Sequence, residues 1–76
     1  MSAYHVELDI RGMNCPLPVV KTNQQIQKMK SGQVLRVIAA DQNSTADIET
    51  FCRETGNKLI SKSFNGGNYE FCIRRH

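Results

Sequence analysis

Several features are missing from this 76-residue sequence, and each absence excludes a class of protein. It has no tryptophan, and no apolar run approaches the roughly 18 residues that a membrane span requires. The N-terminus also lacks the basic and apolar segments of a signal peptide. We therefore expect a soluble, cytoplasmic chain that contacts no membrane.

The cysteine pattern is equally sparse. Three cysteines are an odd number, and no C-x-x-C pair occurs. Neither a disulfide framework nor a zinc site is indicated. His5 and His76 stand apart from the cysteines in sequence and are expected to be solvated. The sequence therefore predicts no metal and no cofactor.

The composition is that of one small globular domain spanning 1–76. Hydrophobic residues make up 39% of the chain and charged residues 22%, which argues against disorder. No repeat or linker interrupts the sequence. The net charge of +3 is compatible with an acidic partner, RNA included, but is too small to require one.

Hydrophobic periodicity and turn residues predict six elements. Ser44 to Asp47 form a capping-box pattern with Ser44 as the N-cap, so 41–43 is expected to be a loop. A hairpin is expected at the two glycines of Asn65–Asn68. The strands are expected at 5–10, 33–40, 58–64 and 69–74, and the helices at 16–30 and 44–55.

The predicted order β-α-β-α-β-β fixes much of the topology. Two strands joined through a helix should be parallel, whereas a hairpin makes the last pair antiparallel. The sheet is therefore expected to be mixed. Because most strands carry charge on one face, both helices are expected to cover the other.

The stretch from Arg11 to Lys21 contains the candidate reactive group. Cys15 stands immediately before Pro16, and proline is tolerated in the first turn of a helix. The positive end of a helix favours thiolate over thiol and lowers a cysteine pKa from about 8.5. Two registers are compatible with the prolines: Cys15 is the N-cap, or Leu17 is the N-cap with Pro18 as the first helical residue.

Other residues are candidates to support this cysteine. Loops that follow parallel strands leave the sheet at one edge, so Asp41 is expected to lie near the Cys15 loop. Gly12 allows a sharp turn, and Arg11 and Lys21 would add positive charge. Asp41 would oppose that charge by pairing with one of them. Solvated surface roles for Arg11 and Lys21, and a turn-forming role for Asp41, fit the sequence equally well.

The remaining cysteines have simpler interpretations. Cys52 falls on the apolar stripe of the second helix and is expected to be a small core residue. Cys72 alternates with apolar residues in the last strand and is expected on the open face of the sheet.

The run from Asp9 to Thr22, with Arg-Gly followed by Cys-Pro-x-Pro, resembles the signature of the TusA/SirA-like sulfur carriers. Met13 stands where leucine is common. The resemblance extends over nearly the whole chain, including 32–35, Asp41, 51–52, 55–56 and 66–69. It implies an α/β (α+β) two-layer sandwich with a mixed four-stranded sheet.

The resemblance also implies a function. Cys15 would accept sulfane sulfur as a persulfide from a cysteine desulfurase or a rhodanese-like protein. It would then pass the sulfur to a downstream relay protein, for tRNA 2-thiouridine formation or oxidative sulfur metabolism. Such a carrier is expected to be a monomer and a non-catalytic member of a sulfurtransferase relay.

Two other functions remain compatible with the sequence. One is an RNA-binding module that contacts phosphates through basic residues, although few aromatic residues are available for stacking, so direct nucleic-acid binding is disfavoured. The other is a regulatory protein in which Cys15 senses redox state or only caps the helix. In the RNA-binding alternative, the basic residues that would contact phosphates are Lys28, Lys30, Lys58, Lys62, Arg74 and Arg75.

Overall fold

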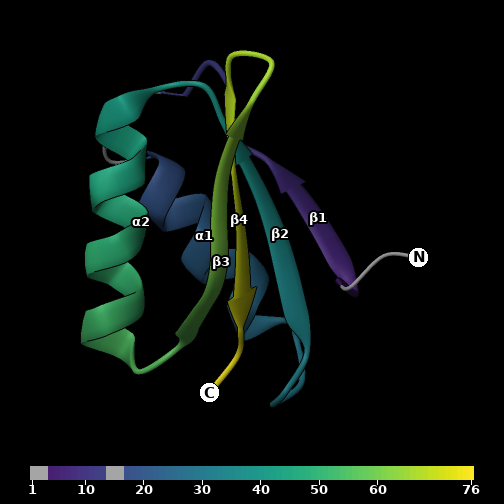
Figure 1. The fold of residues 1–76 in the computed structure, drawn as a ribbon. Coiled ribbons are helices and arrows are strands. Elements are labelled where there is room, and N and C mark those ends of the chain that lie inside the picture. The colour runs from purple at the N-terminus through teal and green to yellow at the C-terminus, as the bar shows by residue number, and fades with distance from the viewer. Residues whose placement is uncertain (1–3, 14–16) are drawn as a thin grey trace.

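The computed structural model describes residues 4–13 and 17–76 (Figure 1). The elements follow the predicted order β-α-β-α-β-β, and their limits differ from the sequence-based ranges by a few residues at most. The strands are β1 (Val6–Asp9), β2 (Val34–Ala39), β3 (Lys58–Asn65) and β4 (Asn68–Arg74), and the helices are α1 (Leu17–Gln27) and α2 (Gln42–Thr55).

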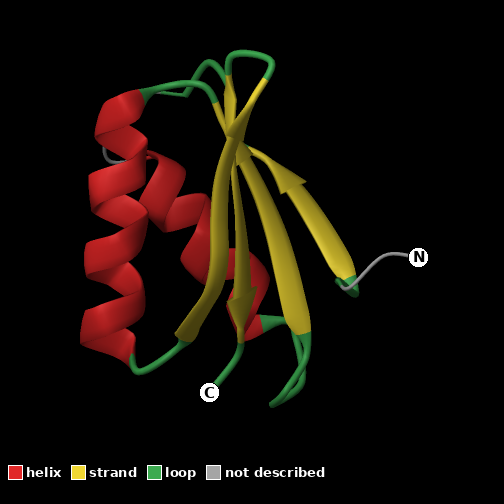
Figure 2. Ribbon diagram, viewed as in Figure 1, coloured by secondary structure: helices red, strands yellow, loops and turns green. Residues whose placement is uncertain are grey.

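The four strands form one mixed sheet in the order β1-β2-β4-β3. β1 runs parallel to β2, and β4 runs antiparallel to both β2 and β3. Both helices lie on the same face of this sheet, which gives two layers (Figure 2). The mixed sheet and the one-sided helices are therefore confirmed.

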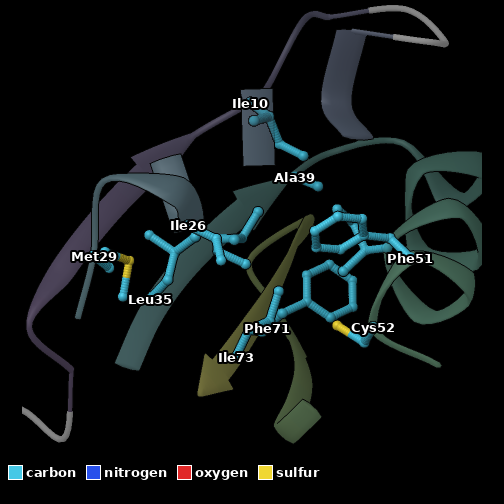
Figure 3. Close-up of a cluster of buried hydrophobic side chains, with 11 residues drawn as sticks. Ile10, Ile26, Met29, Leu35, Ala39, Phe51, Cys52, Phe71 and Ile73 are labelled. Carbon is cyan, nitrogen blue, oxygen red and sulfur yellow. The ribbon is translucent and has the colours of Figure 1, made fainter. Parts of the chain in front are cut away.

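The core lies between the sheet and the helices (Figure 3). Leu35, Val37 and Ala39 alternate along β2 toward this side, as the sequence predicts, and none of them is exposed. Phe71 and Ile73 of β4 lie beside them and are also fully buried. All five side chains come from the two central strands, and four of them form direct register pairs, Leu35 with Ile73 and Val37 with Phe71. The middle of the sheet therefore anchors the fold.

The other face of the sheet is polar. Arg36, at the middle of this face, contacts Glu7 of β1 at 3.2 Å and Glu70 of β4 at 2.5 Å. Cys72 is the register partner of Arg36 and is half-buried, so its predicted place on the open face is confirmed. The Arg36 guanidinium therefore links β1, β2 and β4 on the face of the sheet that no helix covers.

Helix α1 ends at Gln27, three residues before the predicted end at Lys30. The guanidinium of Arg75, through Nη1, donates to the carbonyl oxygens of Ile26 at 3.0 Å and Gln27 at 3.3 Å, and also to that of Met29. These carbonyls belong to the terminal turn, whose oxygens lack intrahelical donors. A side chain 49 residues distant from Ile26 thus completes the helix end.

The glycine signals are confirmed at two places. Gly56 ends α2 in the left-handed region with φ 81°, and its N–H donates to the carbonyl of Cys52. Gly66 and Gly67 have φ values of 60° and 84°, the pair of positive angles that a type I′ hairpin requires.

Candidate functional site

The loops after β1 and β2 leave the sheet at the same edge, because the two strands are parallel (Figure 1). The first loop leads through the Cys15 motif to α1, and the second leads through Asp41 to α2. The predicted common edge is therefore confirmed for these loops. Cys15 and Pro16 themselves lie outside the described residues.

A tight turn precedes the motif. Ile10 is 1% exposed, and its N–H donates to the carbonyl of Ile38 at 2.9 Å, which continues the β1–β2 ladder. The N–H of Met13 then donates to the carbonyl of Ile10 at 3.3 Å, with Gly12 at φ 81° between them. A positive φ at the third position is typical of a type II turn and favours glycine. The chain is thus fixed to the sheet just before Cys15.

Arg11, the second residue of this turn, is held by Asp9. Arg11 donates to Asp9 through its backbone N–H and Nε, both to Oδ1, and through Nη2 to Oδ2, at 3.0, 2.9 and 2.7 Å. The hydrogen bond from the Arg11 side chain is the main reason that the pKa of Asp9 falls from 3.8 to about 2. Sequence reasoning missed this role of Asp9. The sequence signal for this pair was the position of Arg11 two residues after Asp9, at the end of a strand.

The start of α1 combines a buried and an exposed side. Pro18 is fully buried, and its carbonyl accepts a hydrogen bond from Thr22 Oγ1 at 2.8 Å. Leu17 and Val20 are 47% and 40% exposed, and Lys21 is also exposed. Leu17 already lies within the helix, which argues against Leu17 as the N-cap. The N-cap itself lies outside the described residues.

Helix α2 begins earlier than predicted, because Asp41 and not Ser44 is its N-cap. Asp41 is extended, with φ −106° and ψ 128°, and Oδ1 accepts the N–H of Asn43 at 2.9 Å. Its carbonyl accepts the N–H of Ser44 at 3.0 Å, so 41–43 is a helix start and not a loop. Ser44 is 4% exposed inside the helix. Aspartate caps as well as serine does, and the carboxylate also favours the positive helix end.

Asp41 therefore uses its carboxylate on α2. The pairing with Arg11 or Lys21 that the sequence allowed is absent from the described residues, in which Arg11 pairs with Asp9. The charge of Asp41 also offsets the positive end of α2. The positive N-terminus of α2 is therefore already balanced in part by the Asp41 carboxylate.

An open groove lies between the two helices. It has a volume of about 400 Å³, and its lining is mostly apolar. Val19 and Phe51 also line a second hollow of about 210 Å³ on α2, together with Asp47 and Glu54. The groove includes the exposed Val20, and no sequence signal distinguished this surface from the core stripe. The larger groove is lined by Val19, Val20, Asn23, Gln24, Phe51 and Thr55.

The two described cysteines differ in environment from a reactive thiol. Cys52 is 3% exposed, which confirms its core position. Burial, with a smaller contribution from Glu49, raises the pKa of Cys52 from 9.0 to about 11. Cys72 lies on the open face of the sheet beside Arg36. Within the described residues, no group of three or more His, Cys, Asp or Glu could hold a metal ion.

Comparison with known proteins gives consistent matches. A family model described as sulfurtransferase TusA matches residues 6–75. The sulfur carrier protein TusA of Allochromatium vinosum is 41% identical over 75 residues, 99% of each chain. A putative sulfur carrier protein of Neisseria meningitidis is 36% identical over 67 residues, 88% of this chain and 90% of that protein.

The fold also has a counterpart among solved structures. The SirA-like protein of Desulfitobacterium hafniense superposes with a TM-score of 0.81 over 92% of this chain and 96% of its own, at 19% identity. At that identity the likeness establishes the fold alone, and it confirms the predicted α+β architecture. No helix in the described part of the chain is long and apolar enough to cross a membrane.

Proposed function

Because this chain belongs to the TusA family of sulfurtransferases, we propose that it is a sulfur carrier that accepts sulfane sulfur as a persulfide on Cys15 and transfers it to a downstream protein. The observation that carries the proposal is the family match over 6–75, which includes the whole Cys-Pro-x-Pro motif. The named relatives are themselves called sulfur carrier proteins.

The proposed step is an exchange between a persulfide and a thiolate. Cys15 thiolate attacks the outer sulfur of a donor persulfide, and a new S–S bond forms on Cys15. The donor S–S bond breaks, and the donor cysteine leaves as thiolate. Release is the reverse exchange with the acceptor thiolate. No net oxidation occurs, and a thiol pKa near ambient pH makes such exchange fastest.

The framework around Cys15 supports this role. Ile10 and Pro18, which stand on either side of Cys15 in the sequence, are both buried. Gly12 supplies the turn, and Pro16 would open the helix. Lys21 would add positive charge, whereas Arg11 and Asp41 would act through the turn and the second helix start.

The environments of Cys52 and Cys72 are compatible with a carrier that retains a persulfide on Cys15. A neighbouring thiol would attack a persulfide and release its sulfur while forming a disulfide. Cys52 is buried with a raised pKa, and Cys72 lies on the open face of the sheet, away from the helix layer. We therefore expect neither of them to discharge a persulfide on Cys15.

Partner contact is expected around the same edge. The donor would be a cysteine desulfurase or a rhodanese-like protein, and the acceptor a relay protein leading to tRNA 2-thiouridine or to oxidative sulfur metabolism. Leu17, Val20 and the groove between α1 and α2 provide exposed apolar surface beside the motif. Apolar surface of this kind is typical of the centre of protein interfaces.

Mass spectrometry of cysteine variants tests the proposal. After incubation with a persulfide donor, the protein should gain the mass of one sulfur atom, which a reductant removes. Cys15→Ser should lose this gain, whereas Cys52→Ser and Cys72→Ser should retain it. A gain that persists in Cys15→Ser, or that depends on Cys72, would contradict the assignment.

A further inference from the structure

The end of the molecule opposite the carboxyl ends of β1 and β2 is basic. Residues 28–33, 56–58 and 74–76 meet there (Figure 1). The N–H of Gly32 donates to the carbonyl of Arg75 at 3.0 Å, and the N–H of His76 donates to Asn57 Oδ1 at 2.8 Å. These segments contain five basic residues and no Asp or Glu. We call this set the basic end: Lys28, Lys30, Lys58, Arg74 and Arg75.

Within residues 4–13 and 17–76, no Asp or Glu side chain pairs with the basic end. All Lys, Arg, Asp and Glu of the chain belong to the described residues, and the ion pairs there use Arg11, Arg36 and Lys62. None includes a residue of the basic end. The excess of positive charge on this protein therefore gathers at one end.

Folding explains only part of this arrangement. Arg75 binds the terminal carbonyls of α1, and Lys28 and Lys30 suit the negative end of that helix. Lys58 and Arg74 have no such role. They are direct register partners on β3 and β4, and like charges at opposite positions of a sheet are destabilising. A cost to the fold at this pair points to an anionic partner.

We propose that the basic end binds the phosphate backbone of RNA without sequence preference. A protein partner would need apolar surface at the centre of its contact, whereas phosphate contacts need only cations. Of the four exposed large apolar side chains in the described chain, Leu17, Val20 and Phe64 lie toward the opposite end, and Ile60 alone stands near Lys58, on β3. The shortage of aromatic residues argues against base stacking, and backbone contact requires none.

This binding is independent of sulfur transfer. The carboxyl ends of β1 and β2 and the basic end lie at opposite ends of the sheet, so RNA at the basic end leaves the edge after β1 uncovered (Figure 1). The carrier could then hold an RNA while a protein partner exchanges sulfur at the motif. Cys15→Ser should accordingly bind RNA as the natural protein does.

Fluorescence anisotropy with a labelled oligouridylate, measured across a series of salt concentrations, tests the proposal. Lys30→Gln with Lys58→Gln removes two charges from the basic end. Lys21→Gln with Lys62→Gln removes the same net charge elsewhere and is the matched control. For single strands, each phosphate contact contributes about 0.7 to the slope of log affinity against log salt concentration. The first variant should lose roughly 10-fold in affinity at low salt, and its slope should fall by about 0.7 per lysine.

The control variant should change affinity less than about 2-fold. Equal losses in both variants would show that net charge alone matters and would overturn the assignment of the basic end. Absence of measurable binding at low salt would do the same. Poly-glutamate provides the second probe: if it displaces oligouridylate at equal charge concentration, an acidic protein surface is the better partner and the RNA proposal fails.

Discussion

Arg11 folds back onto Asp9, with Nε 2.9 Å from Oδ1 and Nη2 2.7 Å from Oδ2. The pair joins the last residue of β1 to the first corner of the turn that leads into the Cys15 motif. Both side chains are about half-exposed, so the contact fixes geometry more than it stabilises the fold. The charge of Arg11 is consequently compensated locally.

This pair predicts an acid-dependent stability difference. Arg11→Gln should return the pKa of Asp9 from about 2 toward 3.8. Because the pKa is lowered in the folded state, the contribution is fully present above about pH 4 and is lost as the pH falls toward 2. The free energy of unfolding of natural protein and variant should therefore converge over that range. NMR titration of the Asp9 carboxyl carbon measures the shift directly, and an ordinary titration in the natural protein would contradict it.

The Asp9–Arg11 pair should also influence the pKa of the Cys15 thiol. Its pKa is expected below the free value of about 8.5, because it precedes a helix N-terminus. Asp9→Asn removes a carboxylate and leaves Arg11 unpaired, so the pKa of Cys15 should fall further. Arg11→Gln leaves Asp9 unpaired, so it should rise. Thiolate absorbance against pH measures both, and shifts of the same sign in the two variants would refute an electrostatic origin.

Asp41 gives a prediction about helix capping. Asp41→Ala should lower the free energy of unfolding by about 1 kcal/mol, because the N–H of Asn43 loses its acceptor. Asp41→Asn keeps an acceptor oxygen and should cost less. Urea unfolding measures both variants. A larger loss in Ser44→Ala than in Asp41→Ala would mean that the helix begins at Ser44 after all.

Arg75 should stabilise the end of α1 through its guanidinium. Arg75→Gln should lower the free energy of unfolding by roughly 1–2 kcal/mol, since terminal carbonyls lose a charged donor. Arg75→Lys should recover part of this loss, because an ammonium provides fewer directed donors. Hydrogen exchange at the end of α1 should speed up in Arg75→Gln. Unchanged exchange there would show that the contact is not needed.

These residues also show what sequence can and cannot predict. Alternation within one strand is local, so the inward side chains of β2 and the polar open face follow directly from it. The sequence-based N-cap, Ser44, was wrong because aspartate and serine cap helices equally well, so the residue types alone do not select Asp41. The early end of α1 depends on Arg75, a contact between distant positions that no local pattern contains.

Some features of the candidate site could likewise be predicted from the sequence, and others could not. The type of residue at Cys15, the prolines and Gly12 are readable from the motif, and the parallel strands bring the two loops to one edge. The partner of Arg11 was missed because charge alone does not select Asp9 over Asp41. The groove between the helices required the packed helices themselves.

The three cysteines should react with an alkylating reagent at different rates. Cys15 is expected to react first with iodoacetamide at neutral pH, because its thiolate is favoured. Cys72 is half-buried and should follow. Cys52 is buried, and burial raises its pKa to about 11, so its thiol stays protonated at neutral pH and should react only on unfolding. Peptide mapping over time gives the order, with denatured protein as the control in which all three react. Labelling of Cys52 in the folded protein at the rate of Cys72 would contradict its place in the core.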